Sequence, residues 1–413
     1  MGLPKTAIVV FNHGAFGGAA KRYTHLFSYL DKNFPGSFYY VVNNHLFSQI
    51  KSIFPDINLE NIKIVDLKPR EANESPQNQE KTRYYSDHVE DPLITHKNAN
   101  YPRKVYWYYK NLFRQKKLFR QVERLRKELD IKAFIGVFGG VVPLTFYMNE
   151  EPRRAAVIFS DMDSWFTDVH SDMKKLWYRK YYSFNYALEN AGAVDFLSPY
   201  ILEGIHKIGI KIDESRAFVA PCSFIDYSKC SIGSKPDFEI AFAARLEPDK
   251  NPMMFLEAAK IIHSEFPAVK FRLLGEGTLV YKIENYIKDH ILSDAVDFRF
   301  HNNPPEVFAN TRVFVSLQSN TNYPSQSVLE AMACGNAVIA SNTGDTKLFI
   351  NNKNGILINL NTNELVAALR KLVVNKETTR ALGLYAAGFA KENHTIEKYV
   401  EYYMGLINRV SKY

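Results

Sequence analysis

Short apolar runs alternate with longer segments of helical periodicity along most of the chain. In the first half, most of these runs are apolar at consecutive positions, which is typical of parallel strands buried on both faces. They predict strands at 6–12, 38–44, 62–67, 132–138, 155–161 and 193–198. The helical segments between them include 20–32 and a long stretch at 104–129.

The alternation stops at 225–237, where IDYSKCSIGSKPD is rich in Ser, Lys, Gly and Pro, and we interpret this segment as a linker. A second series then predicts strands at 238–245, 269–275, 296–301, 312–317, 337–341 and 355–359. From about Leu382 onward the pattern is helical. Two successive series of this kind predict an α/β protein with two doubly wound domains and a cleft between them.

We place the N-terminal domain at 1–230 and the C-terminal domain at 236–390. The last helix, at about 395–413, is expected to pack back on the N-terminal domain. A length of 413 residues supports two domains, because a single hydrophobic core rarely organises so long a chain.

Composition narrows the class of protein. Hydrophobic residues make up 46% of the chain and charged residues 23%, which is the balance of a soluble globular protein. We find neither a signal peptide nor an apolar run near the ~20 residues that cross a bilayer. The three cysteines form no metal-like pair, so we expect a reducing, cytoplasmic setting. A net charge of +8 favours an anionic partner.

In doubly wound sheets, ligands bind at the loops that follow the strands. The first strand runs into NHGAFGGAAKR, where Gly17 and Gly18 precede a helix and Arg22 lies one turn inside it. A helix N-terminus attracts anions, so this loop is a candidate phosphate site. The loop does not match G-x-G-x-x-G, and a plain strand-to-helix turn explains it equally well.

Two loops of the second series also carry candidate residues. AARLEPDKNP places Arg245 and Lys250 five positions apart at the end of a strand, where a guanidinium and an ammonium suit a diphosphate. The alternative is a pair of solvated surface cations. In LLGEGTL, Gly275 and Gly277 would let the backbone come close to a ligand.

The segment NYPSQSVLEAMACG predicts a short helix from Gln326 to Cys334, with Ser325 as its N-cap and Gly335 after its end. Its N-terminus would be a second anion site. Glu330 stands inside the helix, where a carboxylate could accept hydrogen bonds from the vicinal hydroxyls of a ribose. The competing interpretation is a helix-favouring Glu on a solvated face.

Taken together, these segments resemble the retaining, nucleotide-sugar-dependent glycosyltransferases of family 4, which have the GT-B fold of two Rossmann-like domains facing a central cleft. The resemblance covers nearly the whole chain and is densest at 238–358. It is carried, in order, by the GG loop with Arg22, LSPYILEGI, VAPCSFID, AARLEPDK, LLGEG, LEAMACGNAVIAS and NKNGILI.

The resemblance implies an acceptor-binding N-terminal domain and a nucleotide-sugar-binding C-terminal domain. Arg245 and Lys250 would hold the donor diphosphate, and Glu330 would bind its ribose. The remaining donor-site residues would be Gly275, Gly277, Pro324, Ser325 and Ser327. Gly17, Gly18 and Arg22 would form a loop near the phosphates or the acceptor.

The chain departs from the family pattern at two positions. The family's E-x7-E motif has a Glu eight residues before the second one, and this chain has Asn322 there. An amide can still bond a hydroxyl, but it carries no charge to stabilise an oxocarbenium-like transition state. Where the family often has a His, this chain has Ser160 and Asp161, so Asn322 and Asp161 are the catalytic candidates. Asp161 and Asp163 also mimic a metal-binding DxD, but two ligands are too few and we expect no metal cofactor.

The segment 103–127 contains ten Lys or Arg residues and one acid, Glu123, with aromatic residues interleaved. A helix of this kind could lie on an anionic membrane, so we consider a peripheral location at the inner membrane face. It could equally be an amphipathic helix with a solvated basic face. Nothing resembles a base-reading module, and we expect no nucleic-acid partner.

These features predict a cytoplasmic, retaining, metal-independent hexosyltransferase. It would move a sugar from a nucleotide diphosphate sugar to a saccharide or lipid-linked saccharide, in the synthesis of cell-surface polysaccharide or glycoconjugate. One alternative is a GT-B-fold nucleotide-sugar epimerase, which needs a proton-abstracting base and makes no glycoside. Another is a non-catalytic subunit that binds nucleotide or glycan.

Overall fold

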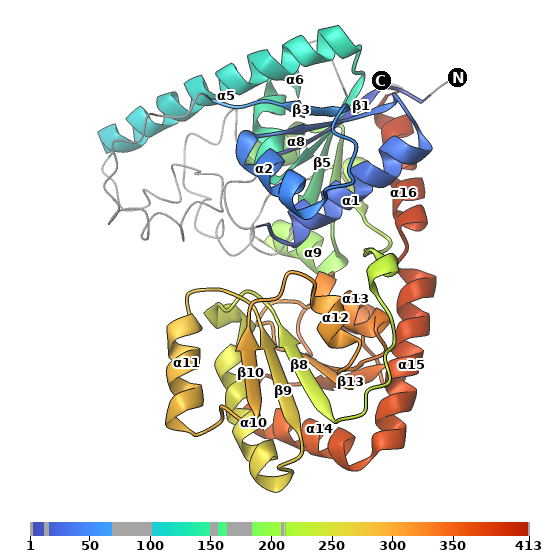
Figure 1. The fold of residues 1–413 in the computed structure, drawn as a ribbon. Helices are drawn as coiled ribbons and strands as arrows, with labels where there is room; N and C mark the ends of the chain where they lie inside the picture. The colour runs from blue at the N-terminus through green and yellow to red at the C-terminus, as the bar shows by residue number, and fades with distance from the viewer. Residues whose placement is uncertain are drawn as a thin grey trace. The chain divides into compact units, whose positions relative to one another are not determined.

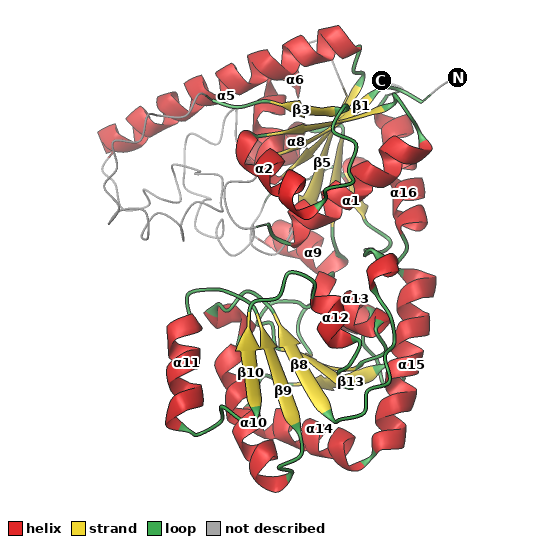
Figure 2. Cartoon of the chain, viewed as in Figure 1, coloured by secondary structure: helices red, strands yellow, loops and turns green. Residues whose placement is uncertain are grey.

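The computed structural model describes residues 3–11, 16–67, 101–148, 156–162, 184–207, 210 and 212–411. The chain divides into two compact units, one of residues 1–221 with 400–413 and one of residues 222–399. Each unit is built around one parallel sheet with helices packed on it (Figures 1 and 2).

The first unit contains a seven-stranded sheet of order β3-β2-β1-β4-β5-β6-β7, in which every pair is parallel. The strands are β1 (Thr6–Val10), β2 (Phe38–Val42), β3 (Ile62–Ile64), β4 (Ala133–Val137), β5 (Ala156–Met162), β6 (Ala193–Phe196) and β7 (Ala217–Val219). All positions of β1, β2, β4 and β6 are buried, which is why these strands appear as uninterrupted apolar runs. β7 was not predicted; it has three half-buried residues at the sheet edge.

Helices of the first unit connect these strands and pack on the sheet. They are α1 (Gly18–Asn33), α2 (Asn44–Ile53), α5 (Tyr101–Leu129), α6 (Thr145–Met148), α8 (Phe184–Asn190) and α9 (Pro199–Lys207), with a 3-10 helix η1 (Phe138–Leu144) after β4. α1 buries Leu26, Phe27 and Leu30, and the Phe27 ring stacks on Tyr40 of β2 with centroids 5.1 Å apart. The helices predicted at 20–32 and 104–129 are confirmed.

The second unit contains a six-stranded parallel sheet of order β10-β9-β8-β11-β12-β13. Its strands are β8 (Glu239–Ala243), β9 (Lys270–Leu274), β10 (Val296–Arg299), β11 (Val313–Ser316), β12 (Ala337–Ser341) and β13 (Gly355–Ile358). Its helices are α10 (Pro252–Glu265), α11 (Val280–Asp289), α12 (Pro304–Phe308), α13 (Gln326–Ala333), α14 (Thr362–Val374) and α15 (Lys376–Asn393). All twelve strands predicted for the two domains are therefore present.

The core of the second unit has two layers because strand side chains alternate between the faces of the sheet. Ile240 and Phe242 of β8 pack on one face with residues of α10 and α14. Ala241 and Ala243 of the same strand pack on the other face with residues of α13 and α15. This arrangement fixes α13, the helix that carries Glu330, directly against the sheet.

Residues 222–237, which include the segment interpreted as a linker, lie within the second unit. The Tyr227 hydroxyl contacts the carbonyls of Ala390 and His394 at 2.7 and 2.8 Å, so this segment is held against α15. The final helix, α16 (Ile396–Val410), contributes Val400 and the residues after it to the first unit.

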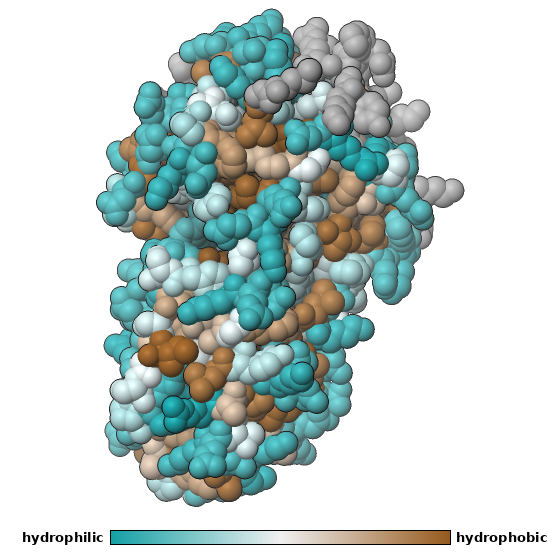
Figure 3. Space-filling model, turned by 90° about the vertical axis from the view of Figure 1, so that its right-hand side faces the viewer, coloured by the Kyte–Doolittle hydropathy of each residue, from teal (hydrophilic) through white to brown (hydrophobic). Residues whose placement is uncertain are grey.

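One face of the molecule is mainly hydrophilic. Figure 3 shows a mainly hydrophilic face with separate hydrophobic patches, as is usual for globular proteins. In the described part of the chain, no helix is both long enough and apolar enough to span a bilayer.

Candidate functional site

Both sheets have a topological switch point, where successive connections leave a central strand in opposite directions. In the first sheet it lies between β1 and β4, and in the second between β8 and β11. Ligands of doubly wound sheets bind outside the carboxyl ends of the strands at this position. The loops that follow β8 and β11, at 244–251 and 317–325, are therefore the expected site of the second unit.

These two loops are tied together by hydrogen bonds. The Ser319 N–H donates to the Asp249 carbonyl at 2.9 Å. The Asn251 amide donates to the Leu317 carbonyl at 2.7 Å and to the Ser319 hydroxyl at 3.1 Å. Asn251 adopts the left-handed conformation, with φ 52°, between a 3-10 turn and the start of α10. The sequence motifs did not indicate Asn251, and we infer that it positions this loop.

Arg245 and Lys250 both lie on the loop after β8, as predicted, but in different environments. The Lys250 ammonium donates to Gln318 Oε1 at 2.8 Å and pairs with Asp249 at 2.9 Å, and its side chain is 18% exposed. Arg245 is exposed, and its guanidinium forms no hydrogen bond or ion pair with any of the described residues. Lys250 is thus held at the switch point, while the Arg245 guanidinium is open to an anion.

Gly275 and Gly277 are required by the packing of their loop. A Cβ on Gly275, whose φ is +146°, would lie 2.0 Å from the Ala244 carbonyl oxygen, and one on Gly277 would lie 2.5 Å from that of Leu246. The Leu246 N–H also donates to the Glu276 carbonyl at 2.7 Å. These contacts hold the backbone on both sides of Arg245. A direct role of the glycines in ligand binding stays a prediction.

The helix predicted between Gln326 and Cys334 is confirmed as α13, and its N-cap is Ser325. The Ser325 hydroxyl accepts from the Val328 N–H at 3.5 Å and lies 3.1 Å from the Ser327 hydroxyl. Glu330 is only 5% exposed, so it is not a helix residue on a solvated face. Keeping a carboxylate buried is costly, and this favours a dedicated role for Glu330.

The C-terminal end of α13 is capped by a buried lysine. The Lys235 ammonium donates to the carbonyls of Cys334 and Gly335 at 2.8 and 2.7 Å, where helix carbonyls lack partners. Burial lowers the pKa of Lys235 to about 8. In the sequence this residue appears only as part of a polar linker, so its role could not be inferred there.

Asn322, one of the two catalytic candidates, is 1% exposed and faces the interior. Its Oδ1 accepts from the Ser316 hydroxyl at 2.6 Å. Its Nδ2 donates to the Ser341 hydroxyl at 2.8 Å and to the Thr346 hydroxyl at 3.0 Å. The amide therefore joins the loops after β11 and β12. Its hydrogen-bonding capacity is used inside the protein, which argues against direct contact with a bound sugar.

The residues singled out in the first domain differ in their surroundings. Gly17 is the N-cap of α1 and Gly18 its first residue, as expected for an anion-binding turn. Arg22 is buried, at 4% exposure, with its guanidinium 5.7 Å from the centre of the Tyr23 ring. Asp161 belongs to β5, but its side chain lies outside the described part of the structure, as does all of Asp163.

A buried polar cluster beside Arg22 was missed by sequence reasoning. The Asp195 carboxylate accepts hydrogen bonds from the Tyr402 hydroxyl at 2.5 Å and from those of Ser160 and Tyr403 at 2.8 Å each. The Tyr23 hydroxyl lies 2.6 Å from that of Ser160. Ser160, noted for standing beside Asp161, is therefore part of an interior network that binds α16 to the sheet.

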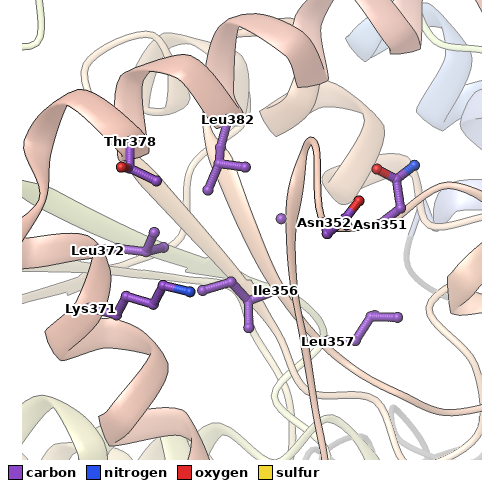
Figure 4. Close-up of a pocket in the computed structure, with 9 residues that line it drawn as sticks. Asn351, Asn352, Ile356, Leu357, Lys371, Leu372, Thr378 and Leu382 are labelled. Atoms are coloured by element: carbon purple, nitrogen blue, oxygen red, sulfur yellow. The ribbon is translucent and has the colours of Figure 1, made fainter.

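A separate pocket of about 380 Å³ lies between β13, α14 and α15 (Figure 4). Ile356, Leu372 and Leu382 point into it, and Lys371 is the one charged residue among those that line it. None of the predicted site residues lines this pocket. We therefore assign it no part in the candidate site.

Comparison with known proteins supports the predicted resemblance to glycosyltransferases. Residues 229–389 match the family model of glycosyl transferases group 1. Over 205 residues the chain is 29% identical to D-inositol 3-phosphate glycosyltransferase of Paenarthrobacter aurescens, covering 45% of this chain and 49% of that protein. Over 174 residues it is 28% identical to poly(ribitol-phosphate) alpha-N-acetylglucosaminyltransferase of Staphylococcus aureus, covering 41% and 35%. The chain thus spans about half or less of these two relatives.

Among solved structures, Anabaena HepE in complex with UDP and glucose superimposes with a TM-score of 0.69. The match covers 97% of this chain and 98% of that one at 13% sequence identity. A likeness at this identity concerns the fold, and it agrees with the two parallel doubly wound sheets. The chain has the two-domain α/β GT-B fold, as predicted.

Proposed function

We propose that this chain is a glycosyltransferase that moves a sugar from a nucleotide diphosphate sugar to a saccharide or lipid-linked saccharide. The observation that carries the proposal is the switch point of the second unit. There the loop with Arg245 and Lys250 is joined to the loop that leads into α13. The match of residues 229–389 to glycosyl transferases group 1 supports the same assignment.

In the proposed mechanism, these groups stabilise the departing diphosphate. The Arg245 guanidinium and the Lys250 ammonium would bind its oxygens, and the free N–H groups at the start of α13 would add partial positive charge. Such groups lower the barrier when they are already in place before charge develops. We propose that no metal cofactor is needed. Loss of activity in EDTA, restored by Mg²⁺, would contradict this.

The nucleoside would be bound through Glu330. Its carboxylate can accept hydrogen bonds from both ribose hydroxyls, and this explains why an acid is retained at a buried position of α13. Glu330→Gln should weaken binding of a nucleoside diphosphate but should weaken binding of its 2′-deoxy analogue less. Calorimetric titration of both ligands against both proteins measures this difference. An equal loss of affinity for the two ligands would show that Glu330 does not bind the ribose hydroxyls.

We also propose retention of the anomeric configuration, a hexosyl donor and membership of family 4, as the sequence resemblance implies. NMR of the first product formed would show its anomeric configuration. The Asn322 amide is already hydrogen-bonded inside the protein. We therefore propose that catalysis depends on the residues that bind the leaving group and not on a group at position 322. Asp161 remains the catalytic candidate of the first domain.

The names of the two relatives described above suggest a chemical class for the acceptor. Their names specify a D-inositol 3-phosphate and a poly(ribitol-phosphate), both of which carry phosphate. The net charge of +8 suits an anionic acceptor. We propose a phosphate-bearing saccharide or polyol acceptor, in the synthesis of a cell-surface polymer or glycoconjugate.

Thermal unfolding with a panel of nucleoside diphosphates tests the donor site first. A ligand present at a hundred times its dissociation constant should stabilise the protein by about 2.7 kcal/mol. Arg245→Ala should reduce the affinity about tenfold to a hundredfold, as expected for a charged hydrogen bond. Arg380→Ala, which removes an exposed arginine of α15, is the matched control. If no nucleotide shifts the transition, the donor site is wrongly assigned.

Product analysis then tests the reaction. Formation of a glycoside with release of nucleoside diphosphate supports the transferase. Conversion of the nucleotide sugar into an isomer without transfer would indicate the epimerase. Nucleotide binding with no turnover on phosphate-bearing acceptors would indicate a binding subunit.

A further inference from the structure

Helix α5 (Tyr101–Leu129) has one face that is packed into the first unit. Leu118 and Val122 are buried on this face. The Phe119 ring stacks on Phe146 with centroids 4.8 Å apart. These contacts fix the rotation of the helix about its own axis, and they determine which residues face outward.

The one acid between residues 103 and 127 is also fixed. Glu123 pairs with Arg126 at 2.9 Å and accepts a hydrogen bond from the Tyr147 hydroxyl at 2.8 Å. The hydrogen bond from Arg126 is the main reason why the pKa of Glu123 falls to about 2. The Lys127 ammonium also lies 3.5 Å from Glu123 Oε1, so the charge of this acid is balanced by Arg126 and Lys127 at the end of the helix.

The outward face carries an ordered stripe of aromatic and basic residues. At about 100° per residue, eight exposed side chains between residues 106 and 127 fall within a sector about 100° wide. In chain order they are Tyr106, Tyr109, Phe113, Lys116, Lys117, Arg120, Arg124 and Lys127. We call these eight residues the α5 stripe. It contains no acidic residue, and its aromatic members all precede its basic members.

The aromatic part of the α5 stripe is unusually accessible. Tyr106 and Tyr109 are each 60% exposed, and Phe113 is 70% exposed. Three large aromatic side chains within two helical turns form an apolar surface that water solvates poorly. The five cations that follow supply an attraction for an anionic surface along the same line of the helix.

We propose that the α5 stripe docks the protein on an anionic lipid bilayer. Aromatic rings favour the headgroup level of a membrane, and Lys and Arg favour the phosphates of anionic lipids. A helix with one face packed on its own domain and such a stripe on the other suits binding in the plane of the interface. This inference is independent of the proposed sugar transfer.

Co-sedimentation of the full chain with vesicles tests the proposal. The protein should bind vesicles that contain phosphatidylglycerol and should bind pure phosphatidylcholine far more weakly. Lys116→Glu with Lys117→Glu should reduce binding to the anionic vesicles at least tenfold, since each basic residue near such a surface contributes measurably. Phe113→Ser should also reduce it, and more of its effect should persist at high salt.

The matched control is Lys282→Glu with Lys288→Glu, which makes the same charge change at two exposed lysines of α11. It should bind the anionic vesicles almost as well as the wild type. A loss as large as that of the α5 variant would show that net charge, and not the stripe, controls binding. Circular dichroism should confirm that both double variants keep the wild-type fold.

Three further results would overturn the proposal. The first is absence of binding to anionic vesicles at low salt, and the second is equal binding to neutral and anionic vesicles. The third is evidence that the α5 stripe binds a partner other than a lipid bilayer. Stripe-dependent binding of a nucleic acid without vesicle binding, or a stripe-dependent dimer in sedimentation velocity, would assign the surface to that partner instead.

Discussion

The buried carboxylate of Asp195 joins α16 to the first sheet, and its removal is a direct test of that joint. Tyr402 and Tyr403 of α16 both donate to it, and so does Ser160 of β5. We consider two changes, Asp195→Ala and Asp195→Asn. The first removes all three acceptor contacts, and the second keeps one carbonyl oxygen and nearly the same volume.

The expected loss can be estimated from the contacts. Hydrogen bonds to charged groups contribute roughly 1.5–3 kcal/mol each, but burial of the carboxylate offsets part of this. Ser160 and Tyr403 would also keep their contacts with the Tyr23 hydroxyl, at 2.6 and 3.1 Å. We therefore expect Asp195→Ala to lower the free energy of unfolding by about 2–4 kcal/mol. Asp195→Asn should cost about 1–2 kcal/mol.

The contribution of Asp195 to the free energy of unfolding should decrease as the pH rises. Burial is the main reason why the pKa of Asp195 is raised; the hydrogen bonds from Tyr402, Ser160 and Tyr403 and the charge of Arg22 act against it. A raised pKa means that the folded state binds the proton more tightly. The resulting stabilisation is complete below the unfolded pKa of about 3.9 and is lost as pH rises through the folded value. The stability difference between wild type and Asp195→Asn should therefore shrink as pH rises.

Hydrogen exchange of β4 and β6 at increasing urea concentration measures this, because both strands belong to the first unit. Asp56→Ala, at an exposed position of the same unit, is the control and should change stability by less than about 0.5 kcal/mol. An Asp195→Ala protein as stable as wild type would refute the role given to the cluster. So would a difference from Asp195→Asn that grows with pH.

Three other predictions concern the second unit. Gly275→Ala should lower the melting temperature of this unit and weaken nucleotide binding, because the added methyl group would meet the Ala244 carbonyl. Gly388→Ala is the control: the space around Gly388 is open, so this change should be neutral or stabilising by up to about 1 kcal/mol. Burial lowers the pKa of His394 from 6.5 to about 4, so the folded state binds this proton less tightly than the unfolded state. The free energy of unfolding should therefore be highest above pH 6.5 and should fall by about 3 kcal/mol as the pH drops to 4. Hydrogen exchange should show this fall in wild type and not in His394→Gln. Asn322→Glu should destabilise the unit by about 2–4 kcal/mol and should not raise turnover in a coupled nucleotide-release assay.

The sheets could be predicted because buried parallel strands are apolar at consecutive positions. β1, for example, is TAIVV with every residue buried. β7 could not be predicted in the same way, because AFV is short and its edge position leaves each residue half-buried. The prediction of a linker at 225–237 was wrong because composition alone does not show which polar residues are buried. The polar composition of this segment is typical of a linker, yet Lys235 is buried and caps a helix.

The position of the candidate site was predictable for a similar reason, since it depends on which loops follow which strands. The loops with Arg245 and with Ser325 both lie at the switch point, as the strand order requires. The orientation of individual side chains was not predictable. Asp195 and Tyr402 are 207 positions apart, and no local pattern in the sequence indicates that they meet.

Asn322 shows how a neutral side chain can join the loops of the candidate site. An amide both donates and accepts, so Asn322 can join the Ser316 hydroxyl to those of Ser341 and Thr346 without burying a charge. A glutamate there would have no N–H to donate and would bring an unpaired carboxylate into the interior. With a neutral side chain at this position, the loops after β11 and β12 are joined without a buried charge. Position 322 therefore offers no charged group to a bound sugar, and the proposed catalysis would depend on stabilisation of the diphosphate leaving group.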